Sequence, residues 1–112
     1  MKPQAVRIPI PEQYGEAYEE CWVERRMQIP RSVYKRWREV ARKDYLTDDD
    51  ALTEIASIMA EIYTAWNLPD LEEPWENPEA IESVAELDLN LFIWLVGSCT
   101  LPLSEFATIE KN

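Results

Sequence analysis

The sequence predicts an α+β fold in which an N-terminal β-hairpin is followed by about four α-helices in one small domain over residues 1–112. Apolar side chains alternate with other residues near the N-terminus, which is typical of a strand. From residue 47 onward they recur every three or four positions, which is typical of amphipathic helices. A chain of 112 residues has room for one such domain.

Residues 1–29 are expected to form the hairpin. A first strand is predicted over residues 5–10, where Pro9 restricts it to an edge of the sheet because proline has no N–H group to donate. A turn is predicted over residues 11–15, which are rich in turn-forming residue types. The second strand is predicted over residues 16–29 and carries bulky side chains on both faces, so we expect it to be covered on both sides.

Four helical segments are predicted after the hairpin. A basic helix is expected over residues 31–45, and an amphipathic helix over residues 47–67 begins with three aspartates that complement the helix dipole. An acidic, proline-containing loop is expected over residues 67–77. Residues 77–98 are then expected to form a helix pair, and residues 99–112 a tail.

Charge is distributed unevenly along the chain. Residues 1–46 carry ten basic and seven acidic side chains, whereas residues 47–112 carry one basic and fifteen acidic ones, and the formal net charge is -11. This asymmetry is typical of a head-to-tail protein interface or of a surface for a basic ligand. An acidic half that only keeps the protein in solution explains it equally well.

The residue types that most enzymes and metal sites need are scarce. There is no histidine, the commonest general base and a common metal ligand. Cys21 and Cys99 lack the spacing of a zinc site and are expected to be free thiols. The two glycines, Gly15 and Gly97, form no phosphate-binding loop. We therefore predict a protein that is not an enzyme, with no catalytic residue, no cofactor and no metal.

Neither a signal peptide nor a membrane span is expected. The longest apolar run covers residues 91–97, far short of the roughly 20 residues that a membrane-spanning helix needs. The basic helix over residues 31–45 is interpreted as a solvated surface rather than a nucleic-acid interface, because the whole chain is acidic. The expected setting is therefore the cytoplasm, without membrane or nucleic-acid partners.

The second half of the chain contains a recognisable order of segments. A capped helix beginning near Asp48 runs into Trp66-Asn67-Leu68, and an acidic loop, the segment Asn77-Pro78-Glu79 and the apolar stretch 89–95 follow. This order is similar to that of the tail assembly chaperones and related small tail proteins of long-tailed bacteriophages. The front half, with a strand bearing Trp22-Val23-Glu24, fits the same pattern.

The resemblance implies a non-enzymatic protein made in the cytoplasm of an infected bacterium. Such a protein would bind the tape measure protein, keep its apolar helices in solution and help to recruit tail tube subunits. A structural tail-completion or connector subunit is an alternative, in which case the protein would remain in the virion.

The last predicted helix is apolar around its circumference, which favours contact with another chain and self-association into a homo-oligomer. An apolar surface rimmed by acids suits an amphipathic helix of a partner. The candidate partner-binding residues are Trp66, Trp75, Leu91, Trp94 and Leu95. For each of them, an ordinary place in the core is the alternative.

A second class of function follows from the charge. An acidic protein without histidine is able to mimic the phosphates of DNA and to inhibit a DNA-binding enzyme, as anti-restriction and anti-CRISPR proteins do. Binding by such a mimic would weaken steeply with salt, whereas binding of an apolar helix would be almost independent of it.

Overall fold

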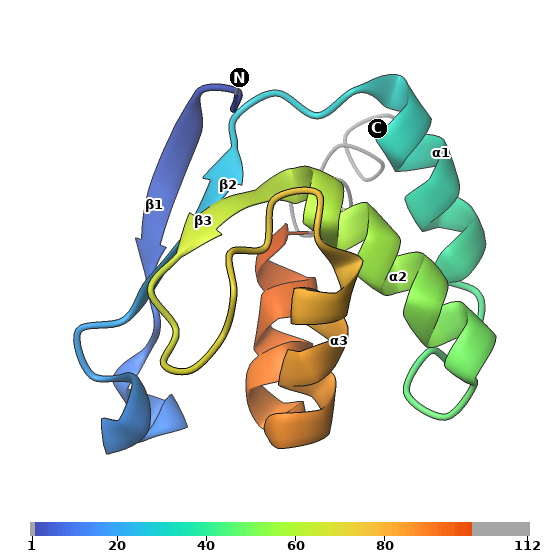
Figure 1. Cartoon of the computed structure of the whole chain (residues 1–112). Coiled ribbons are helices and arrows are strands. Elements are labelled where there is room, and N and C mark those ends of the chain that lie inside the picture. Colours follow the sequence, from blue (N-terminus) through green and yellow to red (C-terminus); the bar gives the residue numbers. More distant parts are fainter. Residues whose placement is uncertain (1, 100–112) are drawn as a thin grey trace, which may run out of the picture.

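The computed structural model describes residues 2–99 and confirms the α+β fold, with an antiparallel sheet and four helices (Figure 1). The elements in chain order are β1 (Ala5–Pro9), η1 (Glu12–Tyr14), η2 (Glu16–Tyr18), β2 (Trp22–Arg26), α1 (Arg31–Val40), α2 (Asp49–Ile62), β3 (Tyr63–Trp66), α3 (Pro78–Leu87) and a last helix over residues 89–99.

Strands β1 and β2 form the predicted hairpin, but their connection is longer than the sequence indicated. Residues 16–18, expected in the second strand, form the short helical turn η2, and β2 begins only at Trp22. Gly15 joins η1 to η2 with φ 103°, a conformation that side-chain-bearing residues rarely adopt. The hydroxyl of Tyr18 donates a hydrogen bond of 2.8 Å to Asp88, which ties this connection to the last helix pair.

The predicted helix over residues 47–67 is wrong at its C-terminal end. Helix α2 ends at Ile62, and β3 follows without a loop and pairs antiparallel with β2. Tyr63 is fully buried, and its hydroxyl donates a hydrogen bond to the backbone carbonyl of Leu95. The apolar spacing fits a helix or a strand here, and pairing with a strand some forty residues earlier decides between them.

The basic helix is also shorter than the predicted range 31–45. Helix α1 ends at Val40, and Asp44 organises the turn that follows. Its carboxylate accepts hydrogen bonds from the backbone N–H of Leu46 and, at 2.7 Å, from the hydroxyl of Thr47. Asp48 then caps α2 by accepting from the N–H groups of Asp50 and Ala51. The local polar side chains therefore fix the turn between the two helices and begin the second one.

Helix α2 lies at the centre of the fold and contacts both α1 and α3 (Figure 1). It buries side chains on most of its surface, and the core continues into β2, α3 and residues 89–99. The core contains Val23, Val33, Val40, Ile55, Ile58, Met59, Ile62, Tyr63, Ile81, Val84, Leu91, Phe92 and Leu95, among others.

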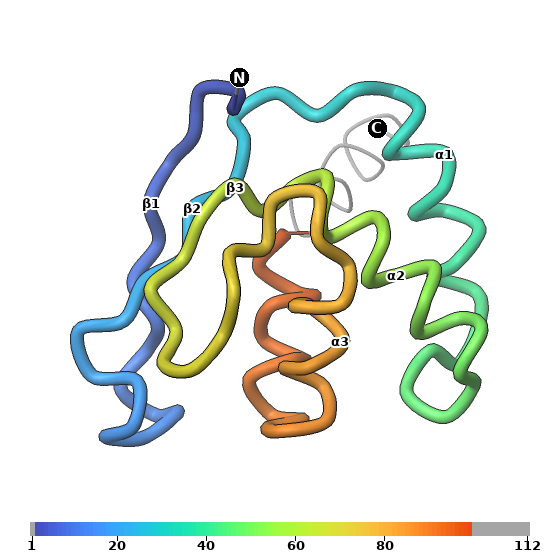
Figure 2. Tube along the Cα trace, in the orientation of Figure 1, coloured from blue at the N-terminus to red at the C-terminus, as the bar shows by residue number. Residues whose placement is uncertain are grey.

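The predicted helix pair over residues 77–98 corresponds to α3 and residues 89–99. The chain reverses at Asp88 between them (Figure 2). Asp88 caps the last helix, because its side chain accepts a hydrogen bond of 3.2 Å from the N–H of Leu91. Of the predicted tail over residues 99–112, only Cys99 falls within the described residues. No helix in residues 2–99 has the length and apolar character needed to span a membrane.

Candidate functional site

Three of the five residues predicted to bind a partner lie in the core of the chain itself. Leu91 and Leu95 are at most 1% exposed, and Trp66 is 6% exposed. The prediction that these three form a docking surface is therefore corrected. The helix over residues 89–99 turns one side into the core, and this side carries Leu91 and Leu95.

Trp66 has a structural role at the end of β3. It lies opposite Val23 of β2, and its indole N–H donates a hydrogen bond of 2.8 Å to the backbone carbonyl of Glu72. This bond fixes the acidic loop against the sheet, because residues 66 and 72 bracket its first part.

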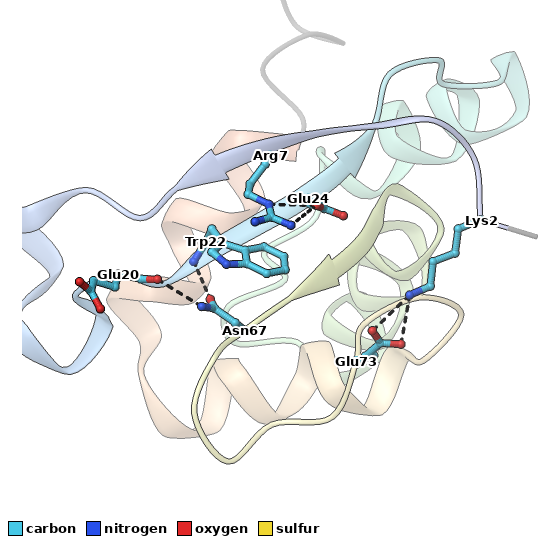
Figure 3. Close-up of polar contacts among 7 residues, drawn as sticks. All are labelled: Lys2, Arg7, Glu20, Trp22, Glu24, Asn67 and Glu73. Carbon is cyan, nitrogen blue, oxygen red and sulfur yellow. Dashed lines mark hydrogen bonds and ion pairs between the residues drawn. The ribbon is translucent and has the colours of Figure 1, made fainter.

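Asn67 fastens the end of β3 to the beginning of β2 (Figure 3). Its Oδ1 accepts a hydrogen bond of 2.7 Å from the backbone N–H of Trp22, and its Nδ2 donates one of 3.2 Å to the backbone carbonyl of Glu20. Leu68, the next residue, is buried. The Trp66-Asn67-Leu68 motif thus builds the fold and does not itself offer a binding surface.

The outer face of the sheet is covered by charged side chains. The guanidinium of Arg7 lies 3.7 Å from the centroid of the Trp22 ring and forms a 2.9 Å ion pair with Glu24 (Figure 3). Lys2 pairs with Glu73 of the acidic loop at 3.1 Å. The guanidinium of Arg7 therefore covers part of the Trp22 ring.

Trp75 and Trp94, the other two candidates, are half-buried and lie in different parts of the surface. The ring of Trp75 is 6.0 Å from the guanidinium of Arg26, at the C-terminal end of β2. The ring of Trp94 is 6.0 Å from that of Tyr14 in η1, in the connection between β1 and β2 at the opposite end of the hairpin. The structure therefore does not join all the predicted residues into one site.

The exposed apolar side chains near Trp94 were not among the predicted residues. Leu87 is 72% exposed, Leu89 49% and Ile93 46%. A hollow of about 360 Å³ next to Ile93 is lined also by Tyr14, Gln13, Asp88 and Asn90. We call the cluster of Tyr14, Leu87, Leu89, Ile93 and Trp94 the apolar patch.

Helical spacing explains why the last helix has both a core side and an exposed side. Leu91 and Leu95 are four residues apart and face the core, whereas Leu89 and Ile93, also four apart, face outward. Gly97 continues the outward row, and a Cβ added there would meet no atom within 4 Å. Asn90 is the one polar residue among residues 89–96, and it lies about 100° around the helix from both Leu89 and Leu91, so the pattern alone does not separate the two sides.

The electrostatic surroundings of the apolar patch are acidic. Glu86 is exposed next to Leu87, and Asp88 lines the hollow. No lysine or arginine occurs in residues 44–110, so the two helices that build the patch carry no compensating charge. A partner with basic residues beside an apolar face would complement this rim.

The two cysteines are free thiols, and burial lowers the reactivity of both. Cys99 is fully buried, and burial raises the pKa of its thiol to about 12. Burial also raises the pKa of the Cys21 thiol. A thiol with a raised pKa is a poor nucleophile near neutral pH, because little thiolate is present. Within residues 2–99, no group of cysteine and carboxylate side chains is placed to hold a metal ion.

No protein family model matches the chain, and neither does any of the curated proteins or solved structures with which it was compared. The function is therefore inferred from the chemistry of the surface.

Proposed function

We propose that this protein is not an enzyme and that it binds an apolar, amphipathic helix of a partner protein at the apolar patch. The biological role that fits this activity is that of a bacteriophage tail assembly chaperone in the cytoplasm of an infected bacterium. The partner in that role is the tape measure protein or a tail tube subunit.

The observation that carries the proposal is the concentration of exposed aliphatic side chains within residues 87–93. Six large hydrophobic residues are exposed among those described, and Leu87, Leu89 and Ile93 are three of them. Ile93 lines a hollow together with Tyr14, whose ring lies 6.0 Å from that of Trp94. Apolar patches of this kind mark interaction sites more often than isolated exposed residues do.

The shape of the last helix suits an approaching helix. Leu89 and Ile93 form an outward row of apolar side chains, and Gly97 continues it without a side chain. A partner helix with apolar residues at i, i+3, i+4 and i+7 would bury its stripe against this row. Glu86 and Asp88 would attract basic residues that flank the stripe.

The experiment measures affinity for a synthetic amphipathic peptide with a leucine stripe at that spacing and lysines beside it. Ile93→Asp is expected to weaken binding by roughly tenfold or more, because a charge would replace a central apolar anchor. Leu46→Asp is the matched control, since Leu46 is also 46% exposed but lies outside the apolar patch. Equal effects of the two substitutions would contradict the proposal.

One observation favours the second candidate, an acidic mimic of DNA. The loop after β3 and helix α3 together carry Asp70, Glu72, Glu73, Glu76, Glu79, Glu82 and Glu86, with no basic residue among them. A mimic would bind a basic enzyme with an affinity that falls steeply between about 0.1 M and 1 M salt, as the Debye length shrinks from about 10 to 3 Å. Peptide binding at the apolar patch is expected to weaken much less over this range, because salt screens the attraction of the lysines to Glu86 and Asp88 but not the apolar contacts.

A structural tail subunit would use the same surface in a different way, since it would stay in the assembled particle. Mass spectrometry of purified particles separates the two roles. A chaperone is expected to be absent from them and present in the lysate.

A further inference from the structure

One side of helix α1 carries a row of unpaired positive charges. Arg31, Lys35 and Arg38 lie on α1 at i, i+4 and i+7, Arg42 follows in the turn two residues after its end, and all four are exposed. At 3.6 residues per turn the three helical residues fall within about 60° around the helix axis and extend over about 10 Å. We call these four residues the basic stripe.

The other cations of α1 and its C-terminal turn are already used within the chain. Arg36 pairs with Glu61 of α2, and Lys43 pairs with Glu54 at 3.0 Å. By contrast, no hydrogen bond or ion pair joins a side chain of the basic stripe to any residue in 2–99. The stripe lies opposite Val33 and Val40, which face the core, so it points away from the rest of the fold.

Helix α3 carries a row of the opposite charge. Glu79, Glu82 and Glu86 follow one another at i, i+3 and i+7, and Glu79 and Glu86 are exposed. Glu82 accepts a hydrogen bond from the hydroxyl of Thr53, which fixes its position. These three residues, the acidic stripe, extend over about 10 Å along the helix.

The two stripes do not neutralise each other within one chain. Helix α2 contacts both α1 and α3 and lies between them in Figure 1. Because the basic stripe is on the side of α1 away from the core, no acidic side chain of residues 2–99 pairs with it.

We infer that the basic stripe of one copy docks against the acidic stripe of a second copy of this chain. The two stripes have opposite charge and both recur every three or four residues, so α1 and α3 packed side by side bring Lys35 and Arg38 near Glu82 and Glu86. The contact joins two different surfaces, so it is heterologous, and it builds a ring or an open chain of copies.

A second copy fits this surface better than a nucleic acid does. The molecule carries a net charge of -11, and residues 44–110 contain no cation. A nucleic acid has phosphates well beyond the length of the basic stripe, and these would face that acidic surface. The acidic stripe is about as long as the helical part of the basic stripe and ends with the helix that carries it.

The net charge also sets the salt range in which the contact forms. Two copies with a charge of -11 repel each other at low ionic strength. At about 0.1 M salt the Debye length is about 10 Å, shorter than the smallest 30 Å dimension of the molecule, so distant charges are screened. Pairs in direct contact still attract there, but at about 1 M salt they too are weakened.

Sedimentation velocity over a range of protein concentrations tests the inference. Wild-type protein is expected to self-associate at about 0.1 M salt and to dissociate at about 1 M. The charge reversal Lys35→Glu/Arg38→Glu is expected to give a monomer under both conditions. The matched control is Lys2→Glu/Arg7→Glu, which changes the net charge by the same amount but at the ion pairs with Glu73 and Glu24, away from α1 and α3. This control is expected to retain self-association.

A mixing experiment identifies the partner surface. Glu79→Lys/Glu86→Lys alone is expected to be monomeric, because its α1 and α3 are both basic. Mixed in equal amounts with Lys35→Glu/Arg38→Glu, it is expected to associate again, since each variant then offers the charge that the other needs.

A wild-type protein that stays monomeric at all concentrations, or a mixture that does not associate, would overturn the inference. So would a monomer that binds a DNA oligonucleotide through Lys35 and Arg38. The peptide assay tests the apolar patch through Ile93, which belongs to neither stripe, and it leaves unchanged Glu86, which the acidic stripe shares with the rim of the patch. Failure of the self-association therefore leaves the proposed function separately testable.

Discussion

The side chain of Asn67 and the backbone of Trp22 are joined by a 2.7 Å hydrogen bond across 45 positions of the sequence. Together with the bond from Asn67 to the carbonyl of Glu20, it holds the start of β2 against the end of β3. Asn67→Ala removes both bonds, and we expect it to lower the free energy of unfolding by about 1–2 kcal/mol. Urea denaturation measures this change, and an unchanged midpoint would show that solvent replaces both bonds at no cost.

The two glycines are expected to respond oppositely to alanine. A Cβ at either position would meet no atom within 4 Å, so the backbone decides the outcome. Gly97 is helical, and Gly97→Ala is expected to raise the free energy of unfolding by about 0.5–1 kcal/mol. Gly15 has φ 103°, and Gly15→Ala is expected to lower it by about 1–3 kcal/mol.

Thermal or urea unfolding of the two glycine variants, measured side by side, checks this difference. A decrease for Gly97→Ala would mean that the helix is not continuous at this position. An increase for Gly15→Ala would mean that the connection between η1 and η2 relaxes to a negative φ.

Alkaline pH is expected to destabilise the fold through Tyr18. Burial, with help from the hydrogen bond to Asp88, raises the pKa of Tyr18 from 10.0 to about 12. The folded state therefore holds this proton more tightly than the unfolded state does. The stabilisation is complete below pH 10 and is lost as the pH rises towards 12.

Tyr18→Phe removes this titration, so the loss of stability between pH 10 and pH 12 is expected to be smaller in the variant. Burial also raises the pKa values of Tyr63 and Cys99 in the folded state, so part of the alkaline loss is expected to remain. Identical pH profiles for wild type and Tyr18→Phe would contradict the assignment to Tyr18.

The two thiols are expected to react at different rates with a thiol reagent such as Ellman's reagent. Cys99 is fully buried and Cys21 partly exposed. In the native protein Cys21 is expected to react slowly and Cys99 only upon unfolding, because the reagent needs both access and thiolate. The variants Cys21→Ser and Cys99→Ser assign the two phases, and rapid native reaction of Cys21→Ser would contradict the burial of Cys99.

Local pattern was sufficient to predict the α+β class, the hairpin, the start of the central helix and the reversal between the last two helices. Each of these depends on neighbours in sequence, such as Pro9 at an edge strand or acidic residues at the start of α2. Strand β3 depends instead on pairing with β2, so the helical spacing of Ile62, Tyr63 and Trp66 was misleading.

The candidate site was predicted only in part, because an apolar run does not indicate which side faces the core. The sequence predicts a binding surface at Leu91 and Leu95, but both are buried. Leu89 and Ile93, which are not among the predicted residues, are exposed. The positions of α3 and of η1, which contains Tyr14, determine which side of the last helix is buried. Contacts between residues distant in sequence set these positions.

Backbone amide shifts measured by NMR during a peptide titration show whether the apolar patch binds an amphipathic helix. The shifted amides are expected to cluster at Tyr14 and residues 87–94, with the same pattern at low and high salt. Shifts centred on the acidic loop or on α1, or a response that disappears at high salt, would contradict binding at the apolar patch.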